Sequence, residues 1–189
     1  MEEKRVTVDG ITREVPDPFI VIASENPAGA AGTEPIPETQ IDRFMISLSL
    51  GYPDEDSERE IAMSAGGKRR ETLAEPVITC DELRAMRNAV NDILLDGKTA
   101  EMIVALIKAT RDHPMLSSGA SPRATVALTM MAKASSYMKG KKSVTAEEVT
   151  EAFPSVVRHR IELTPAARRS GATRDGIIRE ILARETGRK

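Results

Sequence analysis

Three polar side chains occupy positions from which they could contact a ligand. The first, Asn26, follows Phe19–Ala23, a continuous apolar run that is typical of a strand buried in a parallel sheet. Ligands of α/β proteins bind at the carboxyl ends of such strands, so Asn26 could reach one. The alternative is that Asn26 and Pro27 form only a turn, and their spacing alone favours that interpretation.

The other two candidates are arginines that could bind an anion. Arg43 precedes a second apolar run, and its rigid fork of N–H donors suits a phosphate. Taken alone, however, Arg43 is better explained as a surface arginine paired with Asp42. Arg123 follows Ser121 and Pro122, which predict an N-cap and a first helical position. A cation in the first turn opposes the helix dipole, which leaves a compensating anion and a solvated arginine equally open.

The first fifty residues are typical of strands and loops. Lys4–Val8 and Ile11–Val15 flank an Asp-Gly pair, which predicts a hairpin. Phe19–Ala23 and Met45–Leu50 are the two predicted sheet strands. A hairpin and two strands do not make a stable sheet, so this region indicates the end of a larger α/β unit.

Helical spacing and capping signals dominate after Pro53. Thr79 with Glu82, and Thr145 with Glu148, match the Ser/Thr-x-x-Glu capping box. The predicted helices are Asp54–Ala65, one opened by Thr79 and reaching Leu94, Thr99–Arg111, Ser121–Lys139, one opened by Thr145, and Arg174–Arg184. The predicted fold class is therefore α/β plus all-α, with an α/β part at residues 1–52, a helical domain at 53–163 and a C-terminal tail with an amphipathic helix at 164–189.

Composition excludes several functional classes. Among 189 residues, Lys and Arg total 27 against 29 Asp and Glu, and a net charge of −2 argues against nucleic-acid binding. The apolar runs are too short for a membrane span, and the N-terminus lacks a signal-peptide pattern, so we expect a cytoplasmic protein. One cysteine and two histidines leave no material for a disulfide or a metal site.

Taken in order, these segments resemble the MoxR-type AAA+ ATPases. The resemblance covers nearly the whole chain and rests on PFIVIASENP at residues 18–27, GTEPIPETQIDRF at 32–44, GYP at 51–53, GASPRA at 119–124 and VRHR at 157–160, with the preceding hairpin VTVDG at 6–10. It implies the C-terminal part of an AAA+ α/β P-loop core, with the hairpin and two sheet strands, followed by a helical-bundle lid.

The resemblance also implies a role for each candidate side chain. Asn26 would be the sensor-1 residue, which positions the attacking water. Arg43 would be the arginine finger, offered to the nucleotide of a neighbouring subunit, and Arg123 would be the sensor-2 arginine, which reaches the nucleotide of its own subunit. Phosphoryl transfer depends on positioning and charge stabilisation, which these side chains can supply. Glu25 departs from the glutamine common in the family, and its carboxylate would repel phosphates unless it is paired or turned away.

Two motifs of a complete ATPase are not found in this sequence. Gly97-Lys98-Thr99 imitates the end of a phosphate loop, but Asp92 stands where the first glycine should be. Val77–Glu82 imitates the acidic strand motif, but the capping box explains it more simply. We expect both motifs to precede residue 1.

The resemblance implies a complete protein that hydrolyses ATP with Mg²⁺ and acts as a ring. Its partners would be protein clients that it remodels or assembles, including proteins with von Willebrand A-like domains. The competing hypothesis is a non-enzymatic helical module that binds other proteins.

Three consecutive residues of the last matching segment, Arg158, His159 and Arg160, invite a joint anion-binding role. Successive helical residues point about 100° apart, so these three cannot bind one phosphate together. We expect His159 on a solvated or intersubunit surface.

We predict that the isolated chain neither hydrolyses ATP nor binds it tightly. Its arginines lack the backbone N–H groups of a phosphate loop, which would hold the phosphates. Isothermal titration calorimetry with Mg-ATP tests this prediction. Micromolar affinity or clear turnover would contradict it.

Overall fold

The computed structural model describes residues 4–25, 36–65 and 75–187. Its elements run in the order β1 (Arg5–Val8), β2 (Ile11–Glu14), α1 (Glu38–Ile41), α2 (Glu55–Ser64), α3 (Cys80–Asn91), α4 (Gly97–Arg111), β3 (Leu116–Ser118), α5 (Pro122–Met138), α6 (Ala146–Val157), β4 (Glu162–Leu163), α7 (Pro165–Arg169) and α8 (Arg174–Thr186). The predicted combination of a short strand-bearing part and a larger helical part is confirmed.

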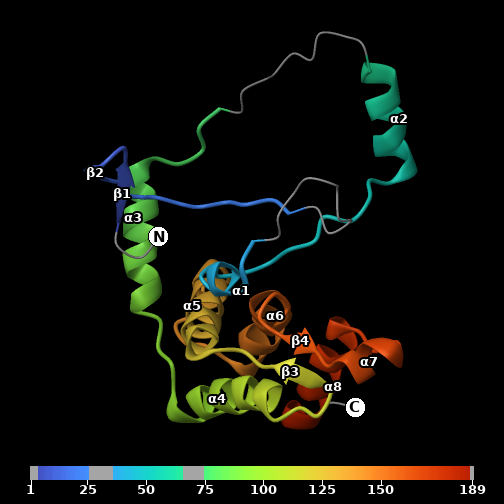
Figure 1. The fold of residues 1–189 in the computed structure, drawn as a ribbon. Helices are drawn as coiled ribbons and strands as arrows, with labels where there is room; N and C mark the ends of the chain where they lie inside the picture. Colours follow the sequence, from blue (N-terminus) through green and yellow to red (C-terminus); the bar gives the residue numbers. More distant parts are fainter. Residues whose placement is uncertain (1–3, 26–35, 66–74, 188–189) are drawn as a thin grey trace.

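Helices α4, α5, α6 and α8 pack around one apolar core (Figure 1). Leu106 of α4, Leu128 of α5, Phe153 of α6 and Ile181 of α8 are each fully buried. Burial of one such side chain contributes about 1.5–3 kcal/mol, so this core supplies most of the stability of the helical part. Among the described residues, no helix is long and apolar enough to cross a membrane.

Helices α3 and α6 begin where the capping boxes place them, whereas α4 begins at Gly97 behind an Asp96 N-cap, two residues before the predicted Thr99. At the start of α3, the Glu82 N–H donates to Thr79 Oγ1 at 3.2 Å, and the Thr79 N–H donates to Glu82 Oε2 at 2.7 Å. At the start of α6, the Thr145 N–H donates to Glu148 Oε2 at 3.1 Å. Each carboxylate satisfies an N–H that the helix itself leaves unpaired. The predicted capping boxes are therefore confirmed.

The N-terminal hairpin is also confirmed. β1 and β2 pair antiparallel, with Val8 opposite Ile11. The connecting Asp9 and Gly10 have φ angles of 52° and 77°, as a type I′ turn requires. Every residue of both strands is exposed.

The two predicted sheet strands, Phe19–Ala23 and Met45–Leu50, are not formed. Ile22 is 90% exposed and Leu50 98%. A strand forms only when a neighbour pairs with its N–H and C=O groups, and the strands of the described residues pair only within β1–β2 and β3–β4. The apolar pattern correctly indicated segments suited to burial, but it carries no information on whether a neighbouring strand is present.

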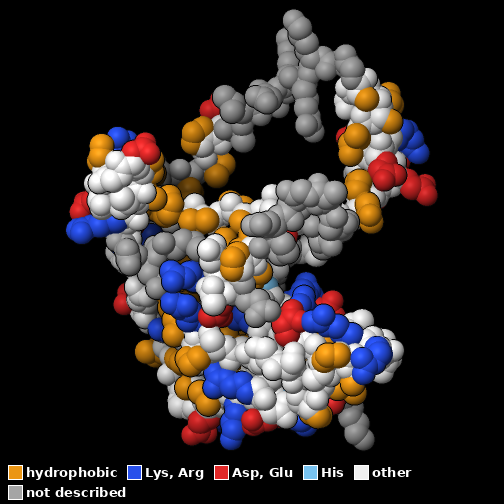
Figure 2. Space-filling view, in the orientation of Figure 1, with side chains coloured by type: hydrophobic (Ala, Val, Ile, Leu, Met, Phe, Trp, Pro, Cys, Tyr) orange, Lys and Arg blue, Asp and Glu red, His pale blue; other side chains and the backbone are white. Residues whose placement is uncertain are grey.

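Helix α2 lies away from the bundle (Figure 1) and buries none of its residues. Figure 2 shows hydrophobic side chains along it, and Met63 is 81% exposed. The predicted helix is confirmed.

The C-terminal residues pack with the helical part. β4 pairs with β3, and Ile177, Ile178 and Ile181 of α8 belong to the core that α4, α5 and α6 share. For the division into residues 1–52, 53–163 and 164–189, we propose that the last segment be grouped with the helical domain.

The loop before α5 passes very close to the end of α4. A Cβ atom on Gly119 would lie 2.6 Å from Arg111 Cα and 2.7 Å from the carbonyl oxygen of Thr110. The Ala120 N–H donates to Thr110 Oγ1 at 3.0 Å, and Arg111 Nε donates to the Ala120 carbonyl at 2.7 Å. Glycine permits this approach, which fixes the position of the N-terminus of α5.

We predict that Gly119→Ala destabilises the 189-residue chain by about 1–3 kcal/mol, because the added methyl group forces two backbone segments apart. Gly97→Ala is the matched control, since a Cβ there meets nothing within 4 Å and alanine favours the helix. Urea unfolding followed by circular dichroism gives both free energies of unfolding. Equal stability of the two variants would contradict the close approach.

Candidate functional site

Asn26, the predicted sensor-1 residue, lies outside the described residues. Its neighbour Glu25 is exposed, and Glu25 Oε1 accepts a hydrogen bond from the Ile36 N–H at 3.4 Å. The carboxylate that departs from the family pattern therefore has a partner within the chain.

Arg43 lies in the tight turn that follows α1. The Arg43 N–H donates to the Gln40 carbonyl at 3.1 Å, and the Phe44 N–H donates to the Ile41 carbonyl at 3.0 Å. The Arg43 side chain is exposed. The alternative explanation of Arg43, an ion pair with Asp42, is not seen among the described residues, where the Asp42 carboxylate binds Arg160 and Ser121.

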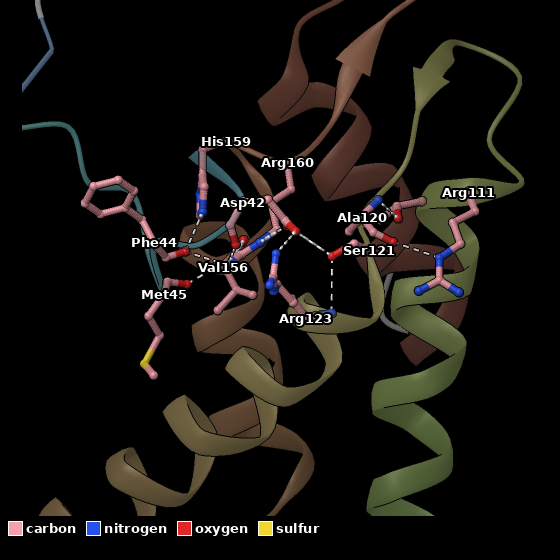
Figure 3. Close-up of polar contacts among 11 residues, drawn as sticks. Asp42, Phe44, Met45, Arg111, Ala120, Ser121, Arg123, Val156, His159 and Arg160 are labelled. Carbon is pink, nitrogen blue, oxygen red and sulfur yellow. Dashed lines mark hydrogen bonds and ion pairs between the residues drawn. The ribbon is translucent and has the colours of Figure 1, made fainter. Parts of the chain in front are cut away.

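The Asp42 carboxylate joins two helices that are distant in sequence (Figure 3). Ser121 Oγ, at the N-cap of α5, donates to it at 2.9 Å, and Arg160 Nε, just beyond α6, donates to it at 3.0 Å. Arg123 Nη1, in the first turn of α5, lies 3.9 Å from Asp42 Oδ2. We call Asp42, Ser121, Arg123 and Arg160 the Asp42 cluster.

Arg123 therefore has a compensating anion. Of the two interpretations that the sequence left open, the structure supports the first, and the anion is the carboxylate of Asp42. The Arg123 side chain is 46% exposed, so it remains accessible from solvent. The Arg123 N–H also donates to Ser121 Oγ at 3.2 Å, as the predicted N-cap requires.

Arg160 is the most deeply enclosed charge of the cluster, with its side chain only 2% exposed. All its N–H groups face oxygen atoms. The contacts are Nε to Asp42 Oδ1 at 3.0 Å, Nη1 to the Met45 carbonyl at 3.1 Å and to the Val156 carbonyl, and Nη2 to the carbonyls of Asp42 at 3.0 Å and Phe44 at 2.5 Å. A guanidinium has five N–H donors, so its hydrogen-bonding capacity is filled. Burial lowers the pKa of Arg160, while the hydrogen bond and charge of Asp42 raise it.

His159 is half-buried beside this cluster, so of its two expected places, a solvated or an intersubunit surface, the structure does not support the solvated one. Its Nε2 lies 3.1 Å from the Phe44 carbonyl, and since a carbonyl only accepts, Nε2 carries the proton. Burial and the neighbouring charge of Arg160 lower the pKa of His159 below 6.5, and they outweigh the Phe44 carbonyl and Asp42, which raise it. The folded chain therefore favours the neutral imidazole.

Sequence reasoning missed Asp42 and Arg160 as a pair. It correctly indicated that Arg158 and Arg160 point apart, since Arg158 pairs with Asp175 at 2.7 Å. The signal for Arg160 was its place between the buried Val157 and Ile161, where a charge needs a partner. The identity of that partner, 118 residues away, is not readable from spacing.

Two family models match the chain, and the Asp42 cluster joins the regions that they cover. One, the "ATPase family associated with various cellular activities (AAA)", matches residues 1–46 and includes Asp42. The other, the "AAA lid domain", matches residues 108–181 and includes Ser121, Arg123 and Arg160. The fold is thus the end of an AAA+ core with its helical lid, and the chain belongs to the AAA+ ATPases.

Individual relatives identify the type of AAA+ protein. The chain is 36% identical over 184 residues to the uncharacterised protein YeaC of Bacillus subtilis (strain 168), covering 97% of this chain and 57% of the relative. It is 29% identical over 191 residues to the chaperone MoxR1 of Mycobacterium tuberculosis, covering 96% and 50%. A solved structure of a proposed ATPase from Cytophaga hutchinsonii superimposes with a TM-score of 0.85 at 30% identity, covering 96% of this chain and 58% of that one.

The chain is the C-terminal portion of a MoxR-type AAA+ ATPase. It spans about half the length of the curated relatives that it matches.

We predict that acidification destabilises the chain through His159. The pKa of His159 is lower in the folded than in the unfolded state, so the unfolded state binds more protons, and the free energy of unfolding falls as pH drops through about 6.5. Urea unfolding at about pH 7.5 and 5.5 should show a larger loss for the wild type than for His159→Gln, which keeps an N–H donor but does not titrate. Both proteins retain His113, so the difference isolates His159. Identical pH dependence would contradict the buried neutral imidazole.

Proposed function

We propose that the complete protein containing this chain hydrolyses ATP with Mg²⁺ as a ring and uses the reaction to remodel or assemble protein partners. The observation that supports this function best is the position of Arg43. Its side chain is exposed, while the backbone on both sides of it is held by Arg160. A permanently charged donor in a fixed place suits the stabilisation of charge on a phosphoryl group.

In this proposal each candidate side chain performs one step. Arg43 is offered to the nucleotide of a neighbouring subunit, where its guanidinium stabilises charge on the transferred phosphoryl group. Asn26 orients the attacking water, and Arg123 binds phosphate oxygens. Mg²⁺ supplies further charge neutralisation, and its ligands belong to the phosphate-loop part of the core. Arg43 and Arg123 suit the phosphate groups of the nucleotide, since both side chains are accessible cations.

Arg123 could contact the nucleotide of its own subunit or that of a neighbouring subunit. The resemblance assigns Arg123 to the nucleotide of its own subunit. Its position 3.9 Å from the carboxylate of Asp42, the residue before Arg43, favours instead the same nucleotide that Arg43 reaches. An incoming phosphate would compete with Asp42 for Arg123 in either case, because both are anions.

The proposal has two further features. The cytoplasmic location rests on the composition of the sequence, and clients with von Willebrand A-like domains rest on the resemblance alone. The non-enzymatic alternative, a helical module that binds proteins, draws support from exposed apolar side chains such as Ile22 and Leu50. An ATPase measurement on the complete protein distinguishes the two, because an interaction module would show no turnover.

We predict that Arg43→Ala in the complete enzyme abolishes turnover but spares ATP binding by the same subunit. Loss of a charge-stabilising arginine costs on the order of a thousandfold in rate. Steady-state ATPase rates and the affinity for a fluorescent ATP analogue measure the two effects. The matched control is Arg184→Ala, which removes an exposed arginine of α8 that pairs with its neighbour Glu185.

Mixed rings test whether Arg43 acts in trans. When Arg43→Ala subunits are mixed with subunits lacking the phosphate-loop lysine, some interfaces pair an intact loop with an intact finger, and activity should reappear. No recovery in demonstrably mixed rings would count against the finger. The same mixture with Arg123→Ala subunits assigns Arg123, since recovery places it in trans and its absence places it in its own subunit.

A further inference from the structure

We propose that Arg160 is a positioning residue for the arginine finger, and that it makes the finger of each subunit move with that subunit's own lid. This inference rests on the proposed function, because it assumes that Arg43 is the finger. It concerns a residue that does not touch nucleotide and acts only through the backbone of another.

The Arg160 guanidinium binds the backbone around Arg43. It donates to the carbonyls of Asp42, Phe44 and Met45, which lie on both sides of Arg43. Its Nε also binds the Asp42 side chain at 3.0 Å. These contacts, drawn in Figure 3, fix the backbone on both sides of Arg43. The Arg43 side chain itself is exposed.

Arg160 is anchored in the lid. It follows α6, whose Phe153, Val156 and Val157 are fully buried in the bundle core. Arg160 Nη1 also donates to the Val156 carbonyl, which ties the guanidinium to α6 itself. The position of the guanidinium is therefore set by the packing of the lid.

Further contacts join the same two segments. His159 Nε2 donates to the Phe44 carbonyl at 3.1 Å, and the Ser47 N–H donates to the Ser155 carbonyl at 2.9 Å. Ile46 packs against the core of the bundle. Residues 42–47 are thus bonded along the end of α6 and form one unit with the lid.

Independent movement of this turn would be costly. It would break the filled hydrogen-bond set of a buried guanidinium and leave an uncompensated charge in a site that is almost free of solvent. Moving the turn together with the lid breaks none of these contacts. When the lid of one subunit closes on nucleotide, its Arg43 should therefore shift relative to the neighbour's nucleotide, which couples adjacent sites.

Lysine cannot replace Arg160 in this role. An ammonium group has three donors around a single nitrogen. The oxygen acceptors of the turn are spread around the planar guanidinium fork of Arg160, and a single nitrogen cannot reach them all. Arg160→Lys keeps the charge and loses most of the backbone contacts, so it separates positioning from electrostatics.

The test uses the complete enzyme with Arg160→Lys and Arg160→Met, beside Arg43→Ala. Misplacement of a catalytic group by about 1 Å costs on the order of a hundredfold, so we expect both Arg160 variants to lose kcat by that factor while KM and ATP affinity of the mutated subunit stay unchanged. In mixed rings with subunits lacking the phosphate-loop lysine, activity should reappear, as for Arg43→Ala. Arg158→Lys is the matched control, because Arg158 lies two residues away and pairs with Asp175 instead.

The outcomes separate this inference from the proposed function. Normal turnover of Arg160→Lys and Arg160→Met, with Arg43→Ala inactive, overturns the positioning role and leaves the finger intact. Normal turnover of Arg43→Ala overturns the proposed function of Arg43 itself. A loss of ATP affinity in the Arg160 subunits, without recovery in mixed rings, shows a merely structural role.

A second measurement keeps the inference testable where the Arg160 variants fail to fold. In the complete enzyme, spin labels are placed at Arg43→Cys and at Val126→Cys, an exposed position of α5. Cys80→Ser removes the cysteine of this chain, and any further cysteine is replaced in the same way. We expect one narrow distance distribution that is the same with and without Mg-nucleotide, since finger and lid move as one unit. A shift of this distance on nucleotide binding overturns the inference.

Discussion

The burial of one guanidinium determines how the two parts of this chain fit together. The Arg160 side chain is 2% exposed, and such a charge is tolerated only when its donors are satisfied and a counter-charge is near. The turn after α1 meets both requirements, because it brings the Asp42 carboxylate and three carbonyl oxygens to the guanidinium. The end of the core segment therefore has one low-energy position against the lid. This position determines where the exposed Arg43 lies.

The packing of the lid brings the partners of Asp42 to its carboxylate. The close approach of Gly119 to Arg111 fixes the start of α5, which places the N-cap Ser121 beside the carboxylate. Ser121 Oγ accepts from the Arg123 N–H and donates to Asp42, so one hydroxyl caps the helix and joins it to the core segment. The packing of α6 against α5 then brings the segment after α6 to the same carboxylate. The same Ser121 hydroxyl therefore caps α5 and positions the site.

The sequence predicted the parts of this fold that depend on local chemistry. The hairpin around Gly10 and the capping boxes at Thr79 and Thr145 follow from residues within four positions of each other, and all are confirmed. The strands at residues 19–23 and 45–50 were wrong because a strand depends on a partner, which a single-segment pattern does not report. The Asp42 cluster was missed for the same reason, since the partners of Asp42 lie 79 to 118 residues from it in the sequence. Arg43 and Arg123 were candidates from their positions, but only the family resemblance gave them roles, because an isolated arginine is usually a solvated one.

The charge balance of the site explains how an acidic chain can suit an anionic ligand. The chain carries a net charge of −2, which argues against bulk attraction to polyanions. Locally, the Asp42 carboxylate faces Arg160 and Arg123. His159 beside them favours the neutral form and adds no charge. The proposal of a phosphate ligand therefore depends on the exposed guanidinium groups of Arg43 and Arg123, which are of the kind that bind phosphate oxygens, and not on the charge of the whole chain.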